Sequence, residues 1–310
     1  MNTSSEHTGD KADVPRARAR ATATAALSVL VLLAGCTSGG ASPAPGAPTT
    51  SGRTSGRATL EAEQDLVVDG QHFKARCTGH GPSVLLVIGY GGTMDDWGDV
   101  PTRLGATART CMYDRLGVGR SDSPPAIQTF EDIAADLDGV ITALRLPRPV
   151  VLVGHSLGGP IAVTWAAHHH TDARALVLLD PSPPGFETAI PSLMPPPDPG
   201  DPELASVLAA NRRFSDPATN RESLDPRSWT TYDRIDRLDV PLWDVVGDQR
   251  PQLPAAVDAD KVAAAWTAGQ GRLASLASGS HVVTATGADD VIWRSHPDLV
   301  VSTVTDALTP

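Results

Sequence analysis

One segment in the middle of the chain constrains the fold more than any other. The apolar run at residues 150–153 leads into Gly154-His155-Ser156-Leu157-Gly158, and residues 157–168 have a helical pattern. A buried strand that turns directly into a helix needs small residues around the turn, which the two glycines supply. Such a turn presents the serine hydroxyl at the carboxyl end of the strand, where the start of the following helix favours negative charge. The segment therefore predicts a strand–turn–helix unit that carries a reactive serine.

The rest of the folded part alternates strands with helices. Further strands are predicted at residues 65–68, 71–77, 83–88, 110–113, 175–179, 240–246 and 281–286, and further helices at 130–144, 255–276 and 291–308. Apolar strands that alternate with helices indicate a mostly parallel sheet covered on both faces. We therefore predict an α/β fold class, in one domain of residues 60–310. Residues 183–237 are rich in proline and interrupt the alternation, and we interpret them as a cap over the site.

The first 35 residues are typical of an export signal. Four basic residues within positions 11–20 precede an apolar run at residues 21–34. That run is shorter than the roughly 20 residues of a membrane-spanning helix and suits a secretion signal. It ends in Leu33-Ala34-Gly35-Cys36, which resembles the lipobox of bacterial lipoproteins, where the signal is cut before the cysteine and the thiol is acylated. We expect a signal peptide at 1–35 and lipidation of Cys36; an ordinary cleaved signal or a short membrane anchor are the alternatives.

The segment behind Cys36 is composed for flexibility. Residues 36–59 are mostly Ser, Gly, Thr, Pro and Ala, which cannot bury a core, so a tether is predicted. The expected location is outside the cytoplasm, with the chain anchored to the outer face of the cell membrane through Cys36. The net charge is −11 and no basic run follows the N-terminal region, which argues against a nucleic-acid partner. The sequence leaves the oligomeric state open.

Three segments together resemble the α/β-hydrolase superfamily. They are Gly154-His155-Ser156-Leu157-Gly158-Gly159, the run from Asp114 to Asp122, and Gly89-Tyr90-Gly91. The resemblance covers residues 60–310 apart from the cap and implies an α/β-hydrolase fold. It implies that Ser156 is the nucleophile and that the backbone N–H groups of Tyr90 and Leu157 form the oxyanion hole. Ile88 stands where the family usually has a histidine before the glycine.

The resemblance leaves the partners of Ser156 incomplete. The acid is expected after the strand at residues 240–246, where Asp248 is the candidate and Asp180, ending the preceding strand, is the alternative. In this family a histidine typically precedes a proline by seven residues, and counting back from Pro297 reaches Asp290. No other histidine is placed to substitute, including His155, whose side chain is expected to point away from the site. We expect Asp290 to act as a weaker base than imidazole.

Two cysteines remain once Cys36 is assigned to the lipid. Cys77 and Cys111 form an even pair, which in an exported protein favours a disulfide; two buried free thiols are the alternative. The family resemblance implies that these cysteines lie on neighbouring strands, at a spacing that a disulfide can bridge.

The expected function is serine-dependent, esterase-like hydrolysis of a small-molecule ester or acyl substrate, weakened by the aspartate at the histidine position. The alternative is a non-catalytic lipoprotein that keeps the fold as a ligand-binding pocket. The sequence has no phosphate-binding loop and no metal-ligand spacing, so no cofactor and no metal are expected.

Overall fold

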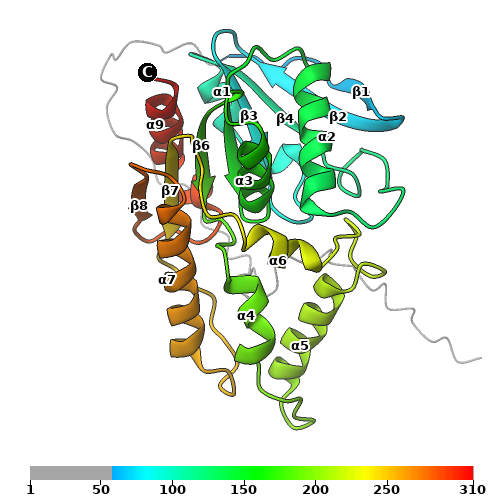
Figure 1. Ribbon diagram of the computed structural model, residues 1–310, viewed down its shortest axis with the longest axis vertical. Coiled ribbons are helices and arrows are strands. Elements are labelled where there is room, and N and C mark those ends of the chain that lie inside the picture. Colours follow the sequence, from blue (N-terminus) through cyan, green and yellow to red (C-terminus); the bar gives the residue numbers. More distant parts are fainter. Residues whose placement is uncertain (1–57, 310) are drawn as a thin grey trace, which may run out of the picture.

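A single sheet forms the centre of the protein (Figure 1). The computed structural model describes residues 58–309, so the predicted signal peptide, the lipidation site Cys36 and nearly all of the predicted tether lie outside the described residues. The eight strands are ordered β1-β2-β4-β3-β5-β6-β7-β8. Their bounds are β1 Gln64–Val68, β2 Gln71–Thr78, β3 Ser83–Val87, β4 Arg109–Tyr113, β5 Val150–His155, β6 Ala173–Leu179, β7 Leu242–Gly247 and β8 His281–Ala285.

Most strand directions agree with how each strand is buried; the edge strand β8, which is parallel but largely exposed, is the exception. β3 and β5 are apolar and buried along their whole length, and the strands from β4 to β8 run parallel. β1 and β2 alternate buried with more exposed residues and pair antiparallel through the turn at Asp69 and Gly70, both at positive φ. The predicted α/β class with a mostly parallel sheet is confirmed.

Helices cover both faces of the sheet and create two hydrophobic clusters. α2 (Phe130–Ala143) and α3 (Gly158–His168) pack on one face. On the other face lie α1 (Val100–Leu104), α8 (Ile292–Ser295) and α9 (Pro297–Leu308), together with the short 3₁₀ helix Met94–Trp97. The sheet is therefore buried between two layers, as parallel sheets require.

Three helices occupy the stretch that interrupts the alternation. α4 (Phe186–Leu193), α5 (Pro202–Ser215) and α6 (Arg227–Tyr232) lie beneath the sheet in Figure 1, with α7 (Ala259–Ser275) beside them. The sequence analysis did not predict these helices, because prolines dominate the segment. Pro202 is tolerated because it stands in the first turn of α5, where its missing N–H costs nothing, and Asp201 caps that helix.

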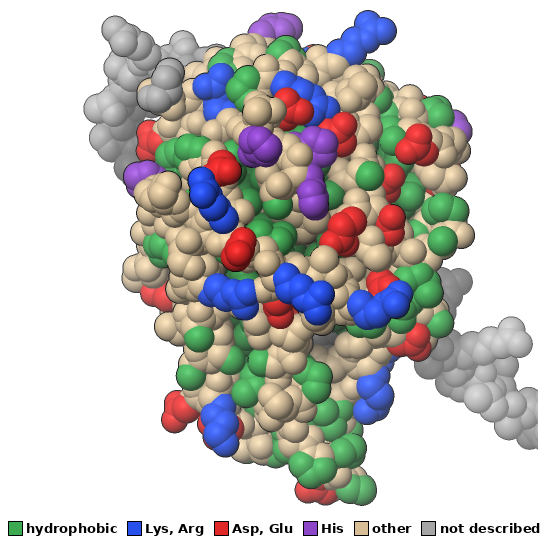
Figure 2. Space-filling view, viewed as in Figure 1, with side chains coloured by type: hydrophobic (Ala, Val, Ile, Leu, Met, Phe, Trp, Pro, Cys, Tyr) green, Lys and Arg blue, Asp and Glu red, His purple; other side chains and the backbone are tan. Residues whose placement is uncertain are grey.

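Figure 2 shows Lys and Arg side chains in a row across the middle of this face, above the region of α4, α5 and α7.

The C-terminal helix differs from its prediction. The predicted helix at 291–308 is two helices, α8 and α9, which meet at His296 and Pro297. A proline disfavours helical backbone at the preceding residue, and His296 accordingly has φ −127° and ψ 52°. Among residues 58–309, no helix has the length and apolarity needed to cross a membrane.

The predicted disulfide is present. Cys77 of β2 and Cys111 of β4 are direct partners in the antiparallel register, and their sulfur atoms are bonded. The bond ties the hairpin strand β2 to the parallel part of the sheet.

Candidate active site

Ser156 lies on a strained turn between β5 and α3. Its φ is +49°, which is rare for a residue with a side chain, and the residue is 7% exposed. The glycines around it are required by close packing. A Cβ atom on Gly158 would lie 2.0 Å from the Val87 carbonyl oxygen, and one on Gly154 would lie 2.6 Å from the Gly158 oxygen. The geometry is that expected for a nucleophile held at the carboxyl edge of a sheet.

The loop after β3 lies directly against this turn. A Cβ atom on Gly89 would lie 3.1 Å from the Ser156 Cβ, so the backbone leading into Tyr90 passes beside the serine. Leu157 is the N-cap of α3 and is buried. The two residues predicted to supply the oxyanion hole are thus both next to Ser156.

The buried ion pair between Arg115 and Glu222 fixes the backbone of this loop. The Arg115 guanidinium donates to the carbonyl oxygens of Ile88 and Gly89, the latter at 2.9 Å. The same guanidinium binds both carboxylate oxygens of Glu222, at 2.9 and 3.0 Å, and the two side chains are 2% and 0% exposed. Glu222 also accepts a hydrogen bond from the Gly91 N–H at 2.7 Å. This pair was not predicted from the sequence.

The ion pair determines where the Tyr90 N–H points. In a planar trans peptide the C=O and the following N–H point in opposite directions. Because the Gly89 C=O is held by Arg115, the Tyr90 N–H points away from Arg115. The cap adds two contacts: the Tyr90 ring packs edge-on against Phe214 at 5.0 Å, and its hydroxyl accepts from the Arg221 N–H at 3.3 Å.

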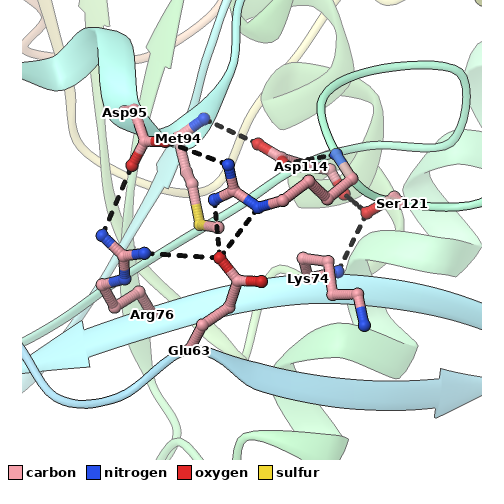
Figure 3. Close-up of polar contacts among 8 residues, drawn as sticks. Glu63, Lys74, Arg76, Met94, Asp95, Asp114 and Ser121 are labelled. Carbon is pink, nitrogen blue, oxygen red and sulfur yellow. Dashed lines mark hydrogen bonds and ion pairs between the residues drawn. The ribbon is translucent and has the colours of Figure 1, made fainter.

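The loop after β4 is fixed by its own polar network (Figure 3). Asp114 accepts from the backbone N–H groups of Met94 and Arg120, at 2.7 and 3.0 Å. Ser121 donates to the Asp114 carbonyl oxygen at 2.7 Å. These bonds close the loop on itself and keep Arg115, the next residue, in position beneath the Gly89–Gly91 turn.

Asp180 is the buried acid on the other side of the serine. It ends β6 at φ +44°, and its carboxylate binds Arg250 at 2.8 and 3.0 Å and the Gly247 N–H at 3.1 Å. Burial raises the pKa of Asp180, although the pair with Arg250 opposes this effect. The Asp180 carboxylate is therefore already paired with a guanidinium.

Asp290 is buried and poorly partnered. It is 6% exposed, and its Oδ2 atom has no hydrogen-bond partner among the described residues. Burial, and next the charge of Asp180, raise the pKa of Asp290 to about 7. Asp289, its neighbour, is exposed and accepts from the Val291 N–H, so Asp290 is the aspartate of this pair that turns inward.

Asp248 lies apart from this group. Its side chain is exposed and accepts from the Gly287 N–H at 2.7 Å, a bond that lowers the pKa of Asp248. It joins the loops that follow β7 and β8. Of the two predicted acid candidates, the structure places the alternative, Asp180, where its charge acts on Asp290.

Two more carboxyl groups were missed. Asp244 of β7 is buried with neither carboxylate oxygen partnered inside the described region, and burial raises the pKa of Asp244 to about 8. The Glu187 carboxyl group of α4 hydrogen-bonds the Ser182 side chain. The Ser182 backbone N–H donates to the Ser156 carbonyl oxygen at 3.3 Å. Burial raises the pKa of Glu187 to about 7. Buried polar residues inside predicted strands or caps were the available signal, and it is weak.

The histidines supply no evident base. The His155 ring packs against Trp97 and Trp293, with ring centroids 6.4 and 4.7 Å apart. Burial lowers the pKa of His155 to about 3. His281 stacks on Trp243 at the start of β8, the opposite end of that strand from Asp290. Within the described part of the chain, no group of three or more potential ligands could hold a metal ion.

Comparison with known proteins settles the family. Residues 82–236 match the model of the alpha/beta hydrolase fold. The chain belongs to the α/β-hydrolase family. The N-formylmaleamate deformylase of Pseudomonas putida is 38% identical over 128 residues, which is 40% of this chain and 47% of that protein. A pimeloyl-(acyl-carrier protein) methyl ester esterase of Chromobacterium violaceum is 36% identical over 106 residues, covering 34% and 39% of the two chains.

Solved structures agree on the fold. The enol-lactonase of Burkholderia xenovorans superposes with a TM-score of 0.54 at 20% identity, over 80% of this chain and 100% of that one. At this identity the likeness concerns architecture alone. The α/β-hydrolase chain described here spans less than half the length of the curated relatives it matches.

Proposed function

We propose that this α/β-hydrolase is a serine-dependent acyl hydrolase whose turnover is slow because Asp290 replaces the imidazole that would activate Ser156. One observation carries the proposal. Ser156 is held at φ +49° beside a loop whose carbonyl groups are bound by Arg115, a geometry that suits an oxyanion hole. A residue held in a strained backbone conformation lowers the stability of the fold, and such strain is concentrated at functional sites.

The chemistry would proceed in two steps. The Ser156 Oγ attacks the ester carbonyl carbon, and the carbonyl oxygen becomes an oxyanion that accepts from the N–H groups of Tyr90 and Leu157. The serine proton passes to Asp290 and then to the departing alcohol, which leaves an acyl-enzyme. Water then attacks the acyl carbon, one of its protons passes through Asp290 to the departing Ser156 Oγ, and the carboxylic acid and the free serine are released.

Asp290 limits this reaction through its reach and not through its pKa. Burial raises the pKa of Asp290 to about 7, so its ionised form is about as basic as an ordinary imidazole, contrary to the expectation of a weaker base. Its side chain is shorter than that of a histidine, and Asp180, which would orient an imidazole, is held by Arg250.

Small-molecule esters or related acyl compounds are the substrates we propose. The names of two relatives describe the removal of a formyl group and the cleavage of a methyl ester, both attacks on a carbonyl carbon. We further propose that the chain works outside the cytoplasm, held at the membrane by a lipid on Cys36. The motif at residues 33–36 supports this location.

Hydrolysis of p-nitrophenyl butyrate by the full chain tests the proposal. We expect slow turnover that Ser156→Ala reduces to the rate without protein, and that Ser192→Ala, an exposed cap serine, leaves unchanged. Equal rates in the native protein and in Ser156→Ala would refute a serine mechanism.

The second candidate is a binding protein that retains the hydrolase fold. The buried acids around Asp290 without an imidazole favour it, because proton transfer is the function that this side of the site serves least well. A native protein that neither hydrolyses esters nor reacts with a fluorophosphonate, yet is folded, would favour this candidate.

A further inference from the structure

A cavity lies beside the cap helix α4, and Arg250, the partner of Asp180, is one of its lining residues. Its volume is about 530 Å³, within the range of small-molecule sites. α4, α7 and the loop that follows β7 enclose it, and its apolar walls include Phe186, Leu253, Val262 and Trp266. Neither Ser156 nor Asp290 lines it, so it is a different place from the serine site.

The aromatic wall of this cavity is held rigidly. Phe186 and Trp266 pack edge to face at 5.0 Å, and Trp266 is 8% exposed. The Arg250 guanidinium lies over the Trp266 ring at 4.4 Å. A preformed wall of this kind reduces the entropy lost when an apolar ligand binds.

Arg250 offers hydrogen-bond donors to a ligand. Three donations are made, two to the Asp180 carboxylate and one to the Gly247 carbonyl oxygen. A guanidinium has five N–H groups, so within the described chain two are left over. The side chain is 32% exposed and lines the cavity, which makes these donors accessible from it.

The charges around the cavity select against charged ligands. Asp180 neutralises Arg250, and Asp260 at the exposed rim is the other charged lining residue. A carboxylate would meet the two aspartates, and an ammonium group would meet the guanidinium. An uncharged oxygen acceptor meets neither penalty.

We propose that this cavity is a second ligand site, which binds an uncharged, aromatic or similarly apolar molecule through one acceptor oxygen hydrogen-bonded to Arg250. The apolar body of the ligand packs on Phe186, Val262 and Trp266. The site is independent of hydrolysis at Ser156.

Calorimetric titration of the full chain with 2-(2-naphthyl)acetamide tests the site. This probe is uncharged, carries one carbonyl acceptor and contains no ester for Ser156 to cleave. Two matched probes replace the amide: 2-naphthylacetate, the anion of 2-naphthylacetic acid and not an ester, puts a negative charge there, and 2-ethylnaphthalene removes the acceptor together with the amide N–H groups. We expect both to bind at least about fivefold more weakly than the acetamide.

Two neighbouring alanines on α7 provide the matched variants. Ala263 lines the cavity and is exposed, whereas Ala264 is exposed and does not line it. Ala263→Trp should fill the cavity and weaken acetamide binding at least about tenfold, and Ala264→Trp should leave the Kd within about twofold. Because both changes are on an exposed helix surface, folding is retained in each.

Several results would overturn the proposal. They are no measurable binding of the acetamide, equal effects of the two tryptophan variants, or binding of 2-naphthylacetate as tight as that of the acetamide. Ser156→Ala should leave the Kd unchanged; a weaker Kd in that variant would place the probe at the serine instead. None of these readings depends on turnover, so loss of the proposed hydrolysis would leave the test intact.

Discussion

The two sides of Ser156 differ in how completely their buried charged groups are paired. On the side of Tyr90, the buried charges of Arg115 and Glu222 are paired, and together they hold three backbone groups of the oxyanion loop. On the side of Asp180, whose charge acts on both Asp290 and Asp244, one carboxylate oxygen of Asp290 and both of Asp244 are buried with no partner in residues 58–309. Burial raises the pKa of both carboxyl groups, to about 7 and about 8.

This difference in pairing indicates which part of the catalysis the site can perform. A positioned oxyanion hole contributes about 10²–10³ to the rate, and a serine hydrolase without its full triad retains about 10³–10⁴ over water. The oxyanion side is equipped for the first contribution. The carboxyl side has no imidazole to supply the rest, so the α/β-hydrolase is expected to stabilise negative charge better than it moves protons.

The largest effect should come from restoring an imidazole. Asp290→His should raise the rate of p-nitrophenyl butyrate hydrolysis by about 10², well short of a complete triad because Asp180 stays paired with Arg250. Asp289→His, which adds the same ring at the exposed neighbour, should change nothing. A loss of activity in Asp290→His would mean that the carboxylate itself is needed.

Breaking the oxyanion side should have the next largest effect. Glu222→Gln leaves the buried Arg115 unpaired, so we expect a loss of about 3–5 kcal/mol in the free energy of unfolding, measured in urea. The loop that carries Tyr90 loses its support, and kcat should fall at least about tenfold with little change in KM. Glu203→Gln, an exposed glutamate of α5, is the control. An unchanged kcat in folded Glu222→Gln would show that the ion pair does not contribute to catalysis.

The pH profile tests the carboxyl side. A carboxyl group with a raised pKa is protonated below that pKa and can act as a base only above it. Hydrolysis after subtraction of the Ser156→Ala rate should therefore rise about tenfold between pH 6 and pH 8, with a midpoint near the pKa of Asp290 of about 7. Asp290→Asn should flatten the profile, whereas Asp289→Asn should preserve it. A native profile that is flat across this range would remove Asp290 from the mechanism.

The smallest effect is expected at Asp248. Its exposed carboxylate accepts from the Gly287 N–H, and the amide oxygen of Asp248→Asn can accept the same bond. The hydrolysis rate should stay within about twofold. Asp180→Asn, which breaks the buried pair with Arg250, should lower the Tm and the rate more strongly. The reverse ranking would make Asp248 the acid.

The sequence supported the predictions that depend on local patterns. Local sequence patterns identified every strand of the sheet, and the Gly154–Gly158 spacing identified the strained turn, because these signals lie within a few residues. The disulfide followed from an even cysteine count and the strand order of the family. The cap helices were missed because prolines are frequent in the segment: Pro202 and Pro226 stand at helix starts, where helices tolerate them, but Pro191 lies inside α4.

The partners in the site could not be predicted, because they are distant in sequence. Arg115 and Glu222 are 107 residues apart, and Asp180 and Arg250 are 70 apart. Nothing in the local pattern around Glu222 distinguishes it from an exposed cap residue. The choice between Asp180 and Asp248 depended on burial, which only the packed structure reveals.

Mass spectrometry of the native chain after reaction with a fluorophosphonate shows whether Ser156 is a working nucleophile. We expect slow formation of a single adduct on Ser156, absent in Ser156→Ala, because the nucleophile and the oxyanion side are in place without an efficient base. No adduct after prolonged reaction of the folded protein, or an adduct on another residue, would rule out Ser156 as the nucleophile.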